Sequence, residues 1–250
     1  MGILKNLIAA LFIFAASSIQ ADEIGNKAQA VFSKYKDSIV NVSLILSMEV
    51  TYAGNVQPEQ EQKIDTKATV FNSNGLLVTA YSNIDPTIAQ PQRNIGGKSL
   101  TIKSSYKEVK LVTDDGSEIP LKVALIDKEQ NLAFLTLDKE HDDYKEVKLQ
   151  EAGFNKNVEV KELDQVVSIT KLGKDLYRKP MVKIGRVSAI VPKPRKRLLC
   201  TVGDSGTPVY SLDGEMIGMA IPKLQNGKNF MQIIPVEEIK EISEQANTKS

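Results

Sequence analysis

The chain has 250 residues with 32 basic and 31 acidic side chains, a nearly neutral balance that excludes the strong positive field of a nucleic-acid-binding protein. Cys200 is the only cysteine, which excludes an intrachain disulfide and a cysteine-based zinc site, and His141 is the only histidine. There is no glycine-rich phosphate loop before a helix and no histidine or cysteine cluster. We therefore predict neither a cofactor nor a bound metal.

The first residues predict export. Lys5 precedes the apolar run 7–16, and the small residue Ala21 follows a short polar stretch. A basic start, a short apolar core and a small final residue are typical of a secretory signal peptide. We expect residues 1–21 to be removed and the mature chain to reach the periplasm or the outside of the cell. The alternative, a buried or membrane-anchoring helix, is less favoured because the apolar run is short for a bilayer, so we predict no membrane span in the mature chain.

The first half of the mature chain predicts one helix and then strands. Residues 23–36 carry apolar side chains at helical spacing, which predicts a short amphipathic helix. Asn74-Gly75 between two apolar runs is typical of a hairpin turn. We expect a polar loop over residues 54–62 and irregular chain over 86–97. The predicted strands cover residues 39–46, 68–71, 76–80, 99–103, 108–113, 119–126 and 132–137.

A charged connector, residues 138–148, separates the predicted units 22–148 and 149–250. The predicted strands of the second half cover residues 158–162, 166–171, 181–190, 198–202, 208–211, 216–221 and 230–234, with a turn at Asn226-Gly227 before the last of them. Pro235 then opens a helix over residues 236–244. About a dozen short strands, with helices only near the ends, predict an all-β barrel or sandwich, and two similar halves predict two barrels.

A serine between two glycines is the main candidate for chemistry. In Gly203-Asp204-Ser205-Gly206, the small residues let the loop wrap closely around a carbonyl group. The N–H groups of Gly203 and Ser205 would then point at one spot, as an oxyanion hole requires. The same letters also make an ordinary turn, so this motif alone leaves both interpretations open.

Four stretches, in one order along most of the mature chain, resemble the HtrA-type branch of the trypsin-like serine proteases. They are FNSNGLLVTA at residues 71–80, DKEQNLAFL at 127–135, IGRVSA at 184–189, and GDSG at 203–206 continued by GEMIG at 214–218 and IIPV at 233–236. This resemblance implies a chymotrypsin-like double β-barrel, and we expect no PDZ domain after the last helix. It also implies that Leu199, six residues before Ser205, helps to line an apolar specificity pocket.

The chain departs from the family pattern at the catalytic positions. By the resemblance, Ser82 stands at the position of the catalytic histidine and Asn131 at that of the aspartate, while Thr207 replaces a glycine. The mature start lacks the sequence that pairs with the aspartate before the serine in the zymogen-activated branch. Asp204 is therefore expected to have no new N-terminus as its partner.

A serine hydroxyl needs a base to become a nucleophile, and neither Ser82 nor Asn131 supplies the imidazole and carboxylate of a triad. We therefore predict an inactive, protease-like binding or scaffold protein for a peptide or protein partner, with Ser205 as a remnant. The alternative is an active serine peptidase with an unusual base, for which His141 or a lysine is available. A third interpretation, a basic binding module, rests on Lys193–Arg197, a cluster that more often forms a solvated surface.

Overall fold

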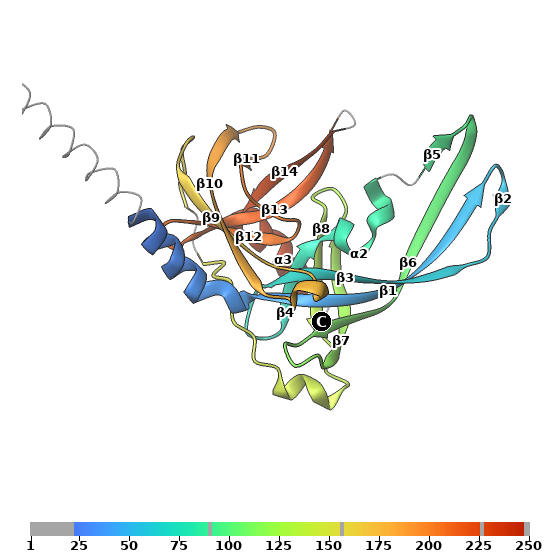
Figure 1. The fold of residues 1–250 in the computed structure, drawn as a ribbon, viewed down its shortest axis with the longest axis horizontal. Helices are drawn as coiled ribbons and strands as arrows, with labels where there is room; N and C mark the ends of the chain where they lie inside the picture. Colours follow the sequence, from blue (N-terminus) through green and yellow to red (C-terminus); the bar gives the residue numbers. More distant parts are fainter. Residues whose placement is uncertain (1–22, 90–91, 156–157, 226–227, 248–250) are drawn as a thin grey trace, which may run out of the picture.

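Two β-barrels pack side by side in the computed structural model, which describes residues 23–89, 92–155, 158–225 and 228–247 (Figure 1). The predicted signal peptide and the predicted turn at Asn226-Gly227 lie outside these ranges. The helices are few and short, so the prediction of an all-β double barrel is confirmed. In the described ranges, no helix combines the length and apolar character needed to cross a bilayer.

The first barrel closes because β1 pairs with both β3 and β6. Its six strands, in the order of their pairing, are β1 (Ile39–Tyr52), β3 (Gln60–Val70), β4 (Leu76–Ala80), β8 (Leu132–Leu137), β7 (Glu118–Asp127) and β6 (Lys98–Val112). Two short strands pair with them at the edges: β2 (Asn55–Val56) with β1, and β5 (Gln92–Ile95) with β6. The second barrel is β10 (Pro180–Val191), β11 (Arg197–Cys200), β14 (Lys228–Pro235), β13 (Met216–Gln225), β12 (Thr207–Ser211) and β9 (Gln165–Lys171).

Helical turns lie at the ends and in the connections. A helix over residues 23–35 continues into η1 (Lys36–Ser38), and α3 (Val236–Asn247) follows β14. The short helix α2 (Tyr81–Ile84) follows β4 directly and leads to η2 (Pro86–Ala89). The remaining turns are η3 (Asp142–Glu146) and η4 (Lys174–Leu176). α2 is an interior helix that the sequence pattern did not predict, and it carries Ser82.

Strand alternation gives the molecule three apolar clusters. Leu77 and Leu135 point into the first barrel, whereas their neighbours Val78 and Phe134 point out of it and pack against the second barrel. The interior of the second barrel is a separate cluster that includes Val209. Because β4 is buried on both faces, all five of its residues are buried and the two barrels form one packed unit.

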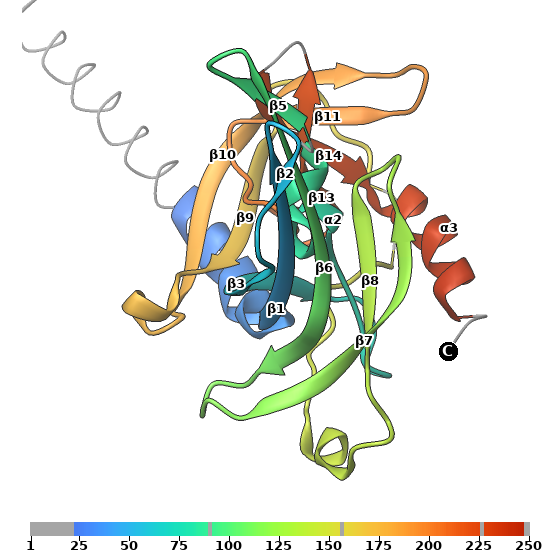
Figure 2. The same cartoon turned by 90° about the vertical axis from the view of Figure 1, so that its right-hand side faces the viewer.

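The N-terminal helix packs on the second barrel, although it precedes the first barrel in the sequence. Tyr35 stacks on Tyr210 with ring centroids 4.5 Å apart, and its hydroxyl donates to the Gly214 carbonyl oxygen at 3.1 Å. Val31 belongs to the same cluster as Tyr210. Figure 2 shows this helix beside β9 and β10, away from α3.

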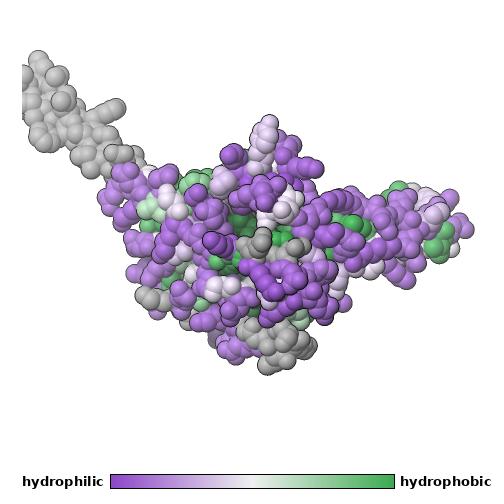
Figure 3. All heavy atoms as spheres, turned by 90° about the horizontal axis from the view of Figure 1, so that it is seen from below, coloured by the Kyte–Doolittle hydropathy of each residue, from purple (hydrophilic) through white to green (hydrophobic). Residues whose placement is uncertain are grey.

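An arm (residues 49–60 and 92–104) projects from the first barrel (Figure 1). The outer parts of β1 and β6 pair along it, and β2 and β5 flank them. Three large apolar side chains on the arm are exposed, namely Tyr52, Val56 and Ile95. Apolar patches are visible along the arm in Figure 3.

Four local predictions were wrong. Residues 158–162 form no strand, and the predicted strands 99–103 and 108–113 are one continuous strand, β6. The expected loop 54–62 contains β2 and the start of β3, and the expected irregular stretch 86–97 contains η2 and β5. Each polar segment is ordered by backbone pairing with β1 or β6, a long-range partner that local sequence does not specify.

The packing between the barrels makes a prediction about stability. Replacing Phe134, which is fully buried, with alanine removes its ring from the cluster between the barrels and should lower the free energy of unfolding by about 3–5 kcal/mol. Tyr177→Ala is the matched control, because this ring is 85% exposed and should change stability by less than about 0.5 kcal/mol. Urea unfolding of both variants measures the difference, and equal stabilities would contradict the packing described here.

Candidate functional site

The serine loop (residues 202–207) connects β11 to β12 through a tight turn. The Thr207 N–H donates to the Asp204 carbonyl oxygen at 3.1 Å, and Gly206 has a φ of 76°, as a type II turn requires at its third position. The Thr207 hydroxyl donates to the same carbonyl at 2.8 Å and accepts from the Asp204 N–H at 3.1 Å. The threonine that replaces the family's glycine therefore fastens the loop internally.

The serine loop lies directly against the first barrel. A Cβ at Gly206 would come within 2.6 Å of Thr79 Oγ1 and 2.9 Å of Asn83 Nδ2, so only glycine fits there. The Thr69 hydroxyl also donates to the Gly206 carbonyl oxygen at 2.9 Å. Gly203 is confined on the other side, since a Cβ there would lie 2.7 Å from the Cβ of Ala220. The two glycines thus allow close contact with both barrels.

Asn83, in α2, holds Ser205 with both ends of its side-chain amide. The Ser205 hydroxyl donates to Asn83 Oδ1 at 2.8 Å, and Asn83 Nδ2 donates to the Ser205 carbonyl oxygen at 3.2 Å. Asn83 Nδ2 also donates to Thr79 Oγ1 at 2.9 Å. The serine is therefore held by a neutral amide, which is not a base at neutral pH.

Ser82 and Asn131 contact each other beside this pair. Asn131 Oδ1 accepts from the Ser82 N–H at 2.7 Å, and Asn131 Nδ2 donates to the Ser82 hydroxyl at 3.1 Å. Asn131 Nδ2 also donates to the Pro222 carbonyl oxygen at 3.0 Å, which ties the turn before β8 to β13. Asn131 has a φ of 57°, a left-handed conformation that asparagine tolerates better than most residues.

The bases that the sequence offered lie elsewhere. His141 is exposed on the segment after β8, where its nearest ionic neighbour is Asp138 at 4.0 Å. Lys183 and Lys67 come close to Asp204, yet neither is a hydrogen-bond partner of the Ser205 hydroxyl within the described part of the chain.

Asp204 has an internal cation as its partner. Lys183 Nζ lies 2.8 Å from Asp204 Oδ1, and both side chains are about one-third exposed. The sequence analysis expected no new N-terminus as a partner of Asp204, and it did not predict that Lys183 would be the partner. Lys183, from β10, supplies the positive charge that the zymogen-activated branch takes from its N-terminus.

Lys67 adds a second cation next to Asp204. It lies on β3, and its ammonium donates to Thr170 Oγ1 at 3.3 Å. Burial lowers the pKa of Lys67, an effect that the negative charge of Asp204 opposes and the positive charge of Lys183 reinforces. Lys67 therefore lies within electrostatic range of the Lys183–Asp204 pair, and the local charge is positive when both lysines are protonated.

Three of the five backbone N–H groups from 203 to 207 have acceptors. Asp204 donates to Thr207 Oγ1, Gly206 to the Ala220 carbonyl oxygen at 2.8 Å, and Thr207 to the Asp204 carbonyl oxygen. Across the described ranges, the N–H groups of Gly203 and Ser205 have none. These are the two groups that the sequence assigned to an oxyanion hole.

Two residues of β11 precede the serine loop. Leu199 is half-buried, opposite Gln232 of β14, while its neighbour Leu198 points into the second barrel. Its role in a specificity pocket remains a prediction from the resemblance. Burial raises the pKa of the Cys200 thiol to about 11, so this cysteine is protonated and unreactive at neutral pH.

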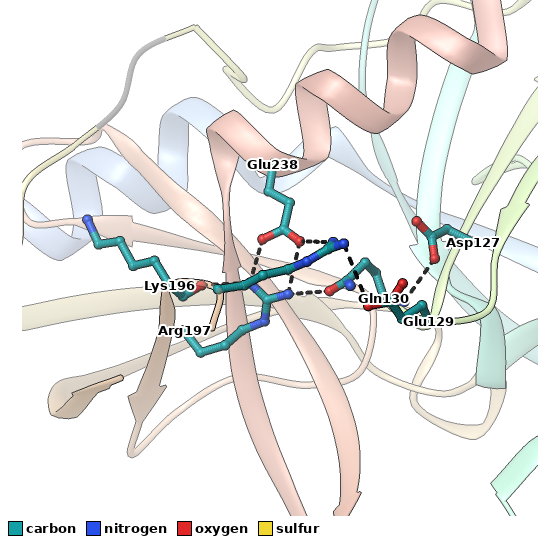
Figure 4. Close-up of polar contacts among 7 residues, drawn as sticks. Asp127, Glu129, Gln130, Lys196, Arg197 and Glu238 are labelled. Atoms are coloured by element: carbon teal, nitrogen blue, oxygen red, sulfur yellow. Dashed lines mark hydrogen bonds and ion pairs between the residues drawn. The ribbon is translucent and has the colours of Figure 1, made fainter. Parts of the chain in front are cut away.

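The basic cluster Lys193–Arg197 is partly neutralised inside the protein. Arg195 and Arg197 both pair with Glu238 of α3, at 2.9 and 3.0 Å for the closest contacts to Glu238 Oε1 (Figure 4). Arg197 also donates to Gln130, in the turn just before Asn131. Burial works to raise the pKa of Glu238, but the two arginines outweigh it and lower that pKa. These contacts hold the turn that carries Asn131 to the second barrel.

A protein-family model for the trypsin-like peptidase domain matches residues 67–219, which are more than half of the chain. The chain belongs to the trypsin-like peptidase domain family. The matched range contains Ser82, Asn131 and the serine loop, whereas Ala220, Pro222 and Glu238 lie beyond it. No curated protein was found to match the chain.

Within this family fold, sequence reasoning found Ser82, Asn131, Gly203 and Ser205, and the structure brings them to one place. It missed the roles of Asn83 and Lys183. Asn83 directly follows the position of the family's histidine, and its polar side chain was the available signal. Lys183 had no signal, because only the pairing of β10 with β9 brings it to the serine loop. Within the described ranges, no group of three or more His, Cys, Asp or Glu side chains gathers to hold a metal ion.

Removing the Lys183 charge should loosen the serine loop. Lys183→Gln removes the 2.8 Å ion pair of Asp204, so backbone amides 203–207 should exchange hydrogen faster, with a loss of about 0.5–1 kcal/mol because the pair is partly exposed. Lys183→Arg should restore slow exchange. The matched control is Lys63→Gln, which breaks a more exposed pair with Glu118 at 2.8 Å and should leave the loop unchanged. Unchanged exchange in Lys183→Gln would contradict this role.

The lowered pKa of Lys67 predicts how the free energy of unfolding changes at alkaline pH. Because burial lowers its pKa below the ordinary 10.5, the unfolded chain binds more protons between the two values. The contribution of Lys67 to stability must therefore rise with pH across that window. The difference in unfolding free energy between the wild type and Lys67→Met should shift in favour of the wild type as pH rises from about 8 toward 10.5. Urea unfolding at several pH values measures this difference, and a shift in favour of Lys67→Met as pH rises would contradict the lowered pKa of Lys67.

Proposed function

We propose that this protein is a catalytically inactive member of the trypsin-like peptidase family that binds a peptide or protein partner. The hydrogen bond from the Ser205 hydroxyl to Asn83 Oδ1 carries the proposal. Nucleophilic attack by serine requires transfer of its proton to a group such as imidazole, and a neutral amide does not accept it. By the resemblance, Ser82 and Asn131 stand at the positions of the catalytic histidine and aspartate, and neither side chain accepts the serine proton at neutral pH.

The retained architecture supports a binding role. The serine loop is fastened to both barrels through Asn83, Thr69 and Lys183, so its shape is fixed by contacts that require no catalysis. By resemblance, Leu199 would line an apolar pocket for one side chain of the partner. The four motif stretches support placing the chain in the HtrA-type branch, and the N-terminal sequence supports export to the periplasm or beyond.

The competing function is a serine peptidase that uses a lysine as its base. The lowered pKa of Lys67 favours it, since a neutral amine near the serine loop is a possible proton acceptor. The amine instead donates to Thr170, and the negative charge of Asp204 opposes the lowering of its pKa by burial. This geometry favours the inactive protein.

Two assays test the proposal on the mature chain. Incubation with unfolded casein should give no cleavage above that of Ser205→Ala, because the hydroxyl has no base. A fluorophosphonate probe should label Ser205 far more slowly than it labels trypsin, by about four orders of magnitude or more. Cleavage that disappears in Ser205→Ala, or labelling at the rate of an active protease, would overturn the proposal in favour of the competing function.

A further inference from the structure

We propose that the serine loop is a receptor site for the free C-terminal carboxylate of a bound peptide, an inference that rests on the proposed function. The recognising groups are the N–H groups of Gly203 and Ser205, the two in this loop that have no acceptor among the described residues. Buried backbone N–H groups are nearly always paired, and both residues lie on a half-buried loop, so these two donors are open to an acceptor that a ligand supplies. Loops of this kind are known to capture terminal carboxylates.

The charge at the site favours an anion over a neutral carbonyl. Lys183 pairs with Asp204, and Lys67, when protonated, adds a positive charge that Asp204 does not balance. Asn131, where the family has an aspartate, adds no negative charge that would repel a carboxylate. Hydrogen bonds from N–H groups to a carboxylate are about twice as strong as those to a neutral amide oxygen. The same two donors therefore hold a chain end more tightly than an internal peptide bond.

The serine hydroxyl does not compete for this ligand. Its proton is donated to Asn83 Oδ1, and the Asn83 clamp holds the loop in place at the same time. A carboxylate is also a poor electrophile, so it stays bound without reacting. The site thus suits a peptide that ends at the serine loop, with its last side chain directed toward the pocket predicted at Leu199.

Paired peptide pools test this inference on the wild-type mature chain. The probes are fluorescein-labelled octapeptides with random sequence that end in leucine, one pool with a free carboxylate and one with a C-terminal amide. Fluorescence anisotropy should show the acid pool binding at least about tenfold more tightly than the amide pool. Equal binding, tighter binding of the amide pool, or no binding of either pool would overturn the inference.

Two variants test whether the preference for a free carboxylate arises at the serine loop. Lys67→Met should weaken binding of the acid pool several-fold, reduce its dependence on salt and leave the amide pool unchanged, because it removes one positive charge. The matched control Lys63→Met removes a cation that pairs with Glu118 and should keep the preference for the acid pool. An acid preference that survives Lys67→Met unaltered would reject the proposed part of Lys67, and an equal loss of the preference in Lys63→Met would reject a charge effect local to the serine loop.

The outcome also separates this inference from the proposed function. Peptide cleavage that depends on Ser205 would show that the protein is an enzyme. Binding without cleavage and without an acid preference would leave an inactive peptide-binding protein and remove only the carboxylate site. The acid and amide comparison uses the unaltered chain, so it decides the matter even where Lys67→Met does not fold.

Discussion

The hydrogen bonds between Asn83 and Ser205 are the constraint on which the site depends. One amide accepts the serine proton and donates to the serine carbonyl, so it joins α2 of the first barrel to the serine loop of the second. Gly206 makes this possible, because any side chain there would collide with Asn83 and Thr79. A contact that fixes the loop in this way also leaves its hydroxyl without a base, which links the rigidity of the site to its proposed inactivity.

The neighbouring charges act on the same loop. Lys183 pairs with Asp204, and the half-buried Lys67 adds a second cation whose pKa is lowered by burial. Further away, Glu238 binds both Arg195 and Arg197, so α3 and the turn before Asn131 are held together. The basic cluster in the sequence is therefore in part an internal clamp between elements. The groups that surround Ser205 and Asp204 are thus neutral amides, hydroxyls and ammonium groups.

Strand periodicity and turn residues predicted the double barrel because they are local properties. The alternation through Leu76–Ala80 and the hairpin at Asn74-Gly75 were visible in the sequence, and both are present. The pattern failed where pairing is long-range, as in β5 and in the full length of β6. At the site, the motif order located Ser82, Asn131 and Ser205. It did not reveal which side chain touches the serine, because Asn83 and Ser82 are adjacent and only the geometry of α2 selects between them.

The sequence by itself determined that the chain has one histidine, His141, and that it lies far along the chain from Ser82, where the resemblance implies an imidazole. The structure places His141 on the exposed segment after β8, and the hydrogen-bond partner of the Ser205 hydroxyl is Asn83. The tertiary structure alone decided what stands there instead. The amide of Asn83 belongs to the first barrel, so only the packing of the two barrels brings it to Ser205. The ammonium of Lys183 reaches Asp204 through strand pairing within the second barrel. The N–H groups of Gly203 and Ser205, which have no acceptor in the described part of the chain, are set by the backbone geometry of the serine loop.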